Sequence, residues 1–154
     1  MTVNRLRCLL LLMLSLRHSN SLLVLRGRAA AVTVDLAQIH LDSGRVTLYK
    51  WGAAPSWLLG EDGAEKIGTA TPPPGLSVTE GRETVERLSL RQGQTLILVS
   101  DGVDPAGILD PGREIWRLPP GELAAKLLER GARGREDDAS VAAVILRPGA
   151  VSTS

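Results

Sequence analysis

Three turn-forming segments divide the middle of the chain, at residues 42–45, 60–63 and 91–94. They read Asp-Ser-Gly-Arg, Gly-Glu-Asp-Gly and Arg-Gln-Gly-Gln, and glycine and aspartate favour tight turns. On both sides of each turn, apolar residues either alternate with polar ones or run together, as in half-buried and fully buried strands. The pattern therefore predicts three pairs of β-strands joined as hairpins, over residues 32–51, 57–67 and 83–100.

The second strand of the third pair is expected in the centre of a sheet. Residues 95–99 read Thr-Leu-Ile-Leu-Val, and a strand that is apolar throughout is covered on both faces. The prolines of Pro72–Gly75 predict an extended loop. Leucines at helical spacing predict a helix over Gly121–Arg130, and Val141–Leu146 reads as a last strand. This order of elements predicts an α+β fold with a mostly antiparallel sheet.

The charge balance argues against a nucleic-acid-binding surface. The 154 residues include 18 basic and 17 acidic side chains, for a formal net charge of +1, whereas nucleic-acid-binding domains are usually strongly basic. The single cysteine, Cys8, excludes an internal disulfide and a zinc site built from cysteines. With no Phe, one Tyr and three Trp, the core should be largely aliphatic. The sequence contains neither a glycine-rich phosphate-binding loop nor the glycine-flanked serine of a nucleophile elbow.

The leucine-rich start of the chain allows three interpretations. A membrane-spanning helix is disfavoured, because the apolar run Cys8–Leu16 is shorter than the roughly 20 residues that a span needs. A signal peptide fits the basic residues before that run, but a small-residue cleavage site occurs only at 29–31. A buried helix that ends near Gly27 explains the leucine spacing best. We therefore predict a Leu-rich helix over residues 1–27.

Two acidic segments lie at the ends of the two most apolar strands. Asp101 directly follows Thr95–Ser100, and Asp137 and Asp138 precede Val141–Leu146. If these strands are antiparallel neighbours, the end of the first lies beside the start of the second, so the carboxylates meet at one edge of the sheet. Oxygen ligands without Cys or His favour Mg²⁺ or Mn²⁺. Asp-Gly and Asp-Asp are also common in solvent-exposed turns, so spacing alone leaves a metal site and plain loops both open.

Four phrases of the sequence together resemble the PPM-type phosphatases, and most closely their stage II sporulation protein E branch. In chain order they are Val34-Asp35-Leu36-Ala37, Lys50-Trp51-Gly52-Ala53-Ala54-Pro55-Ser56, Leu96-Ile97-Leu98-Val99-Ser100-Asp101-Gly102-Val103 and Asp137-Asp138-Ala139-Ser140. Their order extends the resemblance over roughly residues 20–148. The resemblance implies a PP2C-like β-sandwich of mostly antiparallel strands flanked by helices. It also implies a two-metal Mn²⁺ or Mg²⁺ site that hydrolyses phosphoserine or phosphothreonine on a protein.

Carried over residue by residue, the resemblance makes Asp101 a catalytic metal ligand in the Ser-Asp-Gly motif. Asp137 would be the second catalytic ligand, in the Asp-Asp-x-Ser motif, with Asp138 as the alternative metal ligand. The family's earlier Asp-Gly-Met-Gly-type motif, whose aspartate bridges both metals, has no counterpart before Asn20. The sequence thus resembles an N-terminally truncated domain, its C-terminal part at 28–148, followed by a tail at 149–154. Without the bridging carboxylate we expect weak metal binding, in which water and substrate phosphate supply further ligands.

Three hypotheses for function follow. The first is a metal-dependent protein serine/threonine phosphatase that acts on a phosphoprotein substrate, with no nucleic-acid or membrane partner. The second is a catalytically inactive pseudophosphatase fragment that acts by binding another protein. The third is that the functional protein is longer and this chain is its catalytic C-terminal half. The expected location is the cytoplasm, with secretion or membrane association as the alternative if the leucine-rich start acts as a signal.

Overall fold

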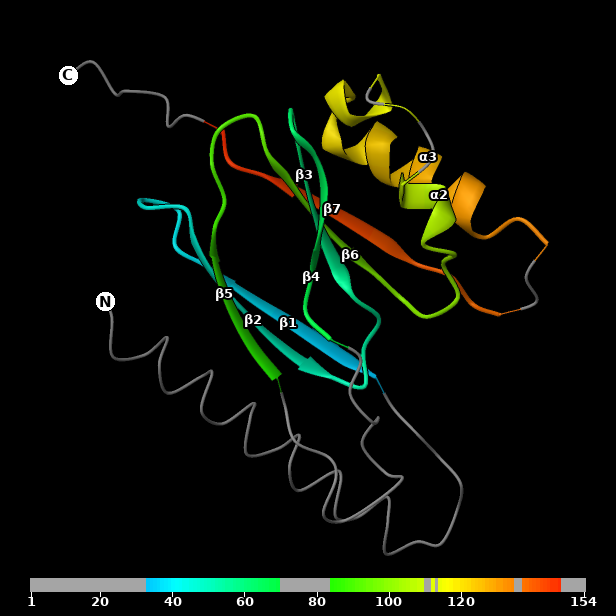
Figure 1. The fold of residues 1–154 in the computed structure, drawn as a ribbon, viewed down its shortest axis with the longest axis horizontal. Coiled ribbons are helices and arrows are strands. Elements are labelled where there is room, and N and C mark those ends of the chain that lie inside the picture. The colour runs from blue at the N-terminus through cyan, green and yellow to red at the C-terminus, as the bar shows by residue number, and fades with distance from the viewer. Residues whose placement is uncertain (1–32, 70–83, 110–111, 113, 135–136, 148–154) are drawn as a thin grey trace, which may run out of the picture.

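The computed structural model describes residues 33–69, 84–109, 112, 114–134 and 137–147. In this part of the chain, seven strands form two antiparallel sheets, and the helices cover one outer face (Figure 1). The α+β sandwich of antiparallel strands is thereby confirmed. Three predicted segments lie outside the described residues: the helix over 1–27, the proline-rich loop at 72–75 and the tail at 149–154.

The first sheet has three strands in the order β1-β2-β5. These are β1 (Val34–Ile39), β2 (Arg45–Trp51) and β5 (Thr84–Ser89). The predicted hairpin over 32–51 is confirmed, since β1 and β2 pair antiparallel from Val34 opposite Trp51 to Ile39 opposite Val46. Its turn depends on Gly44, whose φ of +67° suits glycine. A Cβ at Gly44 would lie 2.3 Å from the Leu90 carbonyl oxygen, so a glycine also permits the close approach of that backbone.

The second sheet has four strands in the order β4-β3-β6-β7. They are β3 (Ser56–Gly60), β4 (Gly63–Ile67), β6 (Thr95–Val99) and β7 (Val141–Ile145). The predicted hairpin over 57–67 is confirmed as the β3–β4 pair. The prediction that Thr-Leu-Ile-Leu-Val is a central strand is confirmed too, because β6 lies between β3 and β7.

The third predicted hairpin is wrong. β5 pairs with β2 in the first sheet, whereas β6 pairs with β3 and β7 in the second. The segment at 90–94 therefore crosses from one sheet to the other. It is anchored at its start, where the buried Leu90 donates its N–H to the Gly44 carbonyl at 2.8 Å. Alternation of side chains identifies a strand and its buried face but not its partner, so the sequence could not separate a hairpin from this crossover.

Three helical segments lie between β6 and β7 in the chain. They are α2 (Ala106–Leu109), the 3₁₀ turn η1 (Ile115–Arg117) and α3 (Pro120–Gly131). The last confirms the predicted helix over 121–130 and begins with proline, which the first turn tolerates. Leu123 and Leu127, one turn apart, are fully buried against the sheet. Among the described residues, no helix has the length and apolar character needed to span a bilayer.

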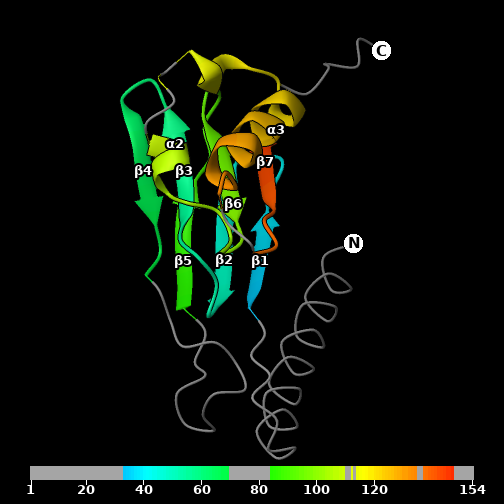
Figure 2. The same ribbon diagram turned by 90° about the vertical axis from the view of Figure 1, so that its right-hand side faces the viewer.

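The described part of the chain forms three layers, with helices, the four-stranded sheet and the three-stranded sheet stacked in that order (Figure 2). Strand β3 contributes to both interfaces, because successive side chains point to opposite faces. Trp57 and Leu59 pack with the helices, and Leu58 packs against the other sheet. The core is mostly aliphatic as expected, with Trp51 and Trp57 as buried aromatic members.

Candidate metal centre

Strand pairing brings the two predicted acidic segments to one edge of the second sheet. β6 and β7 are antiparallel neighbours, with Val99 opposite Val141. The end of β6 therefore lies beside the start of β7, as expected from the sequence. Beyond that pair, Ser100 and Ser140 continue the ladder. The Ser100 N–H donates to the Ser140 carbonyl at 3.0 Å, and the Ser140 N–H donates to Ser100 Oγ at 2.9 Å. These two bonds fasten the loop that carries Asp101 to the loop that carries Asp137 and Asp138.

A glycine lets the two loops touch. A Cβ on Gly102 would lie 2.3 Å from the carbonyl oxygen of Asp138 and 2.8 Å from its carbonyl carbon. Both distances are too short for a Cβ, so only glycine fits here without a shift of the backbone. Ser100 Oγ also lies 3.4 Å from the same oxygen and donates to it. The Ser-Asp-Gly sequence therefore has a structural role, because serine and glycine hold the neighbouring loop while the aspartate between them is exposed.

The side chains of Asp101, Asp137 and Asp138 are all exposed at this edge. Asp137 Oδ1 accepts the N–H of Asp138 at 2.9 Å, which orients one carboxylate from within its own loop. Among the residues that the structure describes, no three His, Cys, Asp or Glu side chains are grouped to hold a metal. The donors are hard oxygens in solvent, so they fit Mg²⁺ or Mn²⁺ that keeps several water ligands rather than an ion held by protein alone.

A cavity of about 260 Å³ lies next to the Ser100–Ser140 pair. It opens between the two sheets, where β1 and the β6–β7 ends lie on the same side of the sandwich (Figure 2). Ser100 and Ser140 line it from the four-stranded sheet, and Asp35 lines it from β1. Asp35 therefore shares one end of the sandwich with the acidic loops.

A buried lysine links the two sheets at this end. Lys50 is fully buried, and its Nζ donates to Asp35 Oδ1 at 2.6 Å and to Ser56 Oγ at 2.9 Å. Because Asp35 is on β1, Lys50 on β2 and Ser56 on β3, the contacts span both sheets. Burial raises the pKa of the Asp35 carboxyl, and the hydrogen bond and charge of Lys50 offset part of that rise.

Sequence reasoning assigned no role to this ion pair, although both residues stand in phrases that carry the resemblance. One signal was available. Lys50 occupies the phase of the buried residues Val46 and Leu48, and a lysine at an apolar position of a strand is seldom fully buried unless it is paired.

The comparisons with known proteins agree with this geometry. The family model described as Stage II sporulation protein E (SpoIIE) matches residues 11–147. The phosphatase domain of the cell fate determinant SpoIIE from Bacillus subtilis, presoaked with Mn, is 26% identical with a TM-score of 0.58. The alignment covers 88% of this chain and 66% of that domain. No curated protein gives a significant match.

Two more distant structures share the fold alone. The serine/threonine phosphatase PstP/Ppp of Mycobacterium tuberculosis is 20% identical with a TM-score of 0.66, over 86% of this chain and 69% of that one. The catalytic domain of the phosphatase PstP in complex with two manganese ions is 18% identical with a TM-score of 0.60, over 83% and 68%. This chain thus spans about two thirds of the length of the solved phosphatase domains that it resembles.

Proposed function

Since the chain belongs to the SpoIIE family of PPM-type serine/threonine phosphatase domains, we propose that it hydrolyses phosphoserine and phosphothreonine in a cytoplasmic phosphoprotein, with Mn²⁺ or Mg²⁺ as the cofactor. The observation that carries the proposal is the contact between the Asp101 and Asp138 loops. Gly102 packs against the Asp138 backbone at a distance that excludes any Cβ. Two acidic loops that are distant in sequence are thereby held at one edge of a sheet.

In this proposal, Asp101 and Asp137 are the metal ligands, with Asp138 as the alternative. A bound divalent cation would activate water for attack on phosphorus and offset the negative charge of the phosphate. The chain's own contribution is positioning. Strand β6 ends directly before Asp101, and the Ser100–Ser140 hydrogen bonds keep the two loops from separating when their carboxylates repel each other.

The test uses the full chain with p-nitrophenyl phosphate and a phosphoserine peptide, with and without millimolar Mn²⁺. The expected result is hydrolysis that requires Mn²⁺, together with a higher unfolding midpoint, because a ligand that binds only the native state stabilises it. Asp101→Asn should abolish both effects. Asp62→Asn, in the exposed β3–β4 turn, is the matched control and should leave both unchanged. Unaltered turnover in Asp101→Asn would contradict the assignment of Asp101.

One observation favours a second function, that of a pseudophosphatase that binds a protein without catalysis. In the described ranges, no cluster of three metal-binding side chains exists, so the described ligand set is incomplete. A folded chain that gains neither turnover nor stability from Mn²⁺ would select this second function.

A further inference from the structure

A cleft separate from the candidate metal centre opens between α2 and α3. Its volume is about 610 Å³. The two helices are in close contact at a pair of glycines, where a Cβ on Gly107 would lie 2.8 Å from the Gly131 Cα. On the α2 side the wall is made by the small residues Ala106 and Gly107, and on the α3 side by long charged side chains. The cleft is therefore open to solvent and lined on one side by groups that can reach a bound molecule.

Cations dominate the α3 wall. Lys126 and Arg130, which are four residues apart on α3, and Arg133, which lies just beyond the end of that helix, all line the cleft. Two carboxylates accompany them, those of Glu129 and Asp104. Asp104 Oδ1 is already used, because it accepts the Ala106 N–H at 2.9 Å. The cleft thus carries an excess of positive charge, although the whole chain is nearly neutral.

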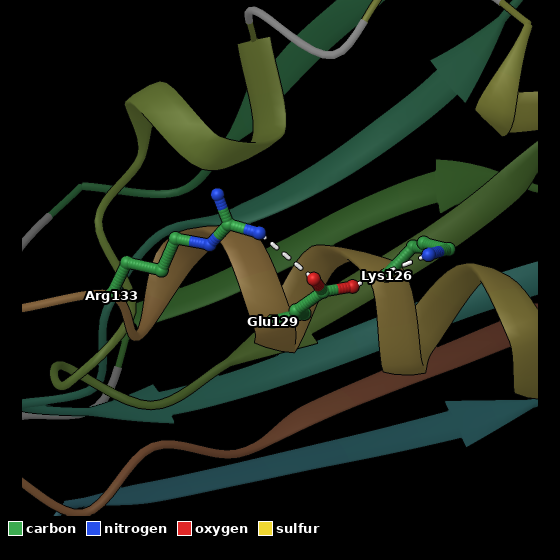
Figure 3. Close-up of polar contacts among 3 residues, drawn as sticks. All are labelled: Lys126, Glu129 and Arg133. Carbon is green, nitrogen blue, oxygen red and sulfur yellow. Dashed lines mark hydrogen bonds and ion pairs between the residues drawn. The ribbon is translucent and has the colours of Figure 1, made fainter.

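Glu129 is shared between two of the cations (Figure 3). Lys126 Nζ lies 3.3 Å from Glu129 Oε2, and Arg133 donates to Oε1 at 2.8 Å. All three side chains are more than half exposed, and exposed ion pairs of this kind contribute little to stability. Incoming carboxylates can therefore exchange with Glu129 at small cost. Arg130 makes no ion pair with any carboxylate in the described part of the chain and is open to a new partner.

Cations near the end of a helix also have an ordinary explanation. They interact favourably with the negative end of the helix dipole, which accounts for Arg130 and Arg133. Lys126 lies more than a turn before the end of α3, where this effect has faded, and yet it lines the same cleft. Stabilisation of the helix therefore explains Arg130 and Arg133 but not Lys126.

The cleft adjoins the loop of the candidate metal centre. The Asp104 N–H donates to the Gly131 carbonyl at 2.9 Å, which ties the end of α3 to the loop that starts with Asp101. Asp137 follows a few residues after the same helix end. The loop that starts with Asp101 therefore also contributes Asp104 to the lining of the cleft.

We propose that the α2–α3 cleft docks an acidic segment of the phosphoprotein substrate, whose carboxylates pair with Arg130 and, in exchange with Glu129, with Lys126 and Arg133. The proposal rests on the proposed function, since it names a feature of the substrate of that site. The cleft then acts as a specificity determinant, because it selects phosphoproteins with Asp and Glu near the phosphorylated residue.

Binding is measured first without phosphate and without metal. A short fluorescent peptide rich in Glu and Asp is titrated with the full chain and followed by anisotropy, beside a Gln and Asn version of the same length. The acidic peptide should bind and the neutral one should not, and about 0.5 M salt should weaken binding by screening. Arg130→Glu should reduce affinity by about tenfold or more. Arg87→Glu, on the exposed side of β5, is the matched control and should retain affinity.

Arg130→Lys keeps the charge, so it should retain most of the binding if Arg130→Glu acts through charge and not through misfolding. Equal binding of the acidic and neutral peptides, or undiminished binding by Arg130→Glu, would overturn the proposal. Displacement of the acidic peptide by inorganic phosphate at the same concentration would also overturn the proposal, since the cleft would then bind a free anion rather than a peptide.

Turnover provides the second measurement. With an acidic phosphopeptide, Arg130→Glu should raise KM by a similar factor with kcat unchanged, and hydrolysis of p-nitrophenyl phosphate should be unaffected. The two proposals fail separately. A chain that binds the acidic peptide through Arg130 but has no phosphatase activity refutes the proposed function only, whereas an active chain that does not bind the peptide refutes the docking site only.

Discussion

Replacing Lys50 with methionine tests how much the buried ion pair stabilises the sandwich. Methionine keeps most of the apolar stem of the side chain but leaves Asp35 and Ser56 without the amine that donates to both. Removal of one partner from a buried ion pair typically costs about 3–5 kcal/mol. Because the Asp35 side chain keeps 17% exposure and can recruit water, we expect a loss near the lower limit, about 3 kcal/mol.

The assay is urea unfolding of the full chain, in which the midpoint should fall with no change in slope. For a protein of this size the loss corresponds to a melting temperature lower by about 6–12 °C. Lys66→Met, on the exposed side of β4, is the control and should change stability little. The double variant Lys50→Met/Asp35→Leu should recover much of the loss, because no buried carboxylate is left unpaired.

Either of two results would show that the ion pair does not stabilise the sandwich in this way. One is a Lys50→Met variant that loses less than about 1 kcal/mol, the scale of an ordinary hydrogen bond. The other is a double variant that is as unstable as the sum of its single variants, because the two side chains would then act independently.

Two further predictions concern the same end of the sandwich. The native pKa of Asp35 is raised above 3.8, so between pH 3.8 and that native pKa the folded chain binds a proton that the unfolded chain does not. The resulting stability is lost as pH rises through this window, and Asp35→Asn should remove that pH dependence in unfolding experiments; an unchanged pH profile would contradict it. Gly102→Ala forces a Cβ against the Asp138 backbone, which should cost about 1–3 kcal/mol and abolish stabilisation by Mn²⁺, whereas Gly121→Ala, with open space around it, should do neither. Mn²⁺ stabilisation that survives in Gly102→Ala would show that the loop contact is dispensable.

The pairing of two strands could be predicted from the sequence where a short turn joins them. The β1–β2 and β3–β4 hairpins were predictable because the glycines and aspartates of their turns fix which strands meet. The crossover after β5 was not, since a turn of similar composition there connects different sheets. The short helical segments α2 and η1 could not be predicted either, because they have too few residues to show a helical period.

The approach of the two acidic loops could also be predicted from the sequence. Two apolar strands with acidic ends suggested that Asp101 and Asp137 approach each other if the strands pair, and β6 and β7 do pair. The contact of Gly102 with the Asp138 backbone could not be predicted, because it depends on how two loops pack. The metal-binding role of the aspartates stays a prediction. Lys50 was overlooked because a charged residue inside a sheet contradicts the alternation used to find the strand.

The pairing of β6 with β7 also has a consequence for the time at which the candidate site forms during synthesis. A chain leaves the ribosome from its N-terminus, so Asp101 emerges before the whole of α3 and before Asp137. The loop with Asp137 and Asp138 leads directly into β7, the last of the described strands, and contacts between distant parts of a sequence are the slow ones to form. Nascent chains that end before Val141 can therefore complete the three-stranded sheet and still lack the edge where the two acidic loops meet. The proposed phosphatase would remain silent until β7 has been made and has docked.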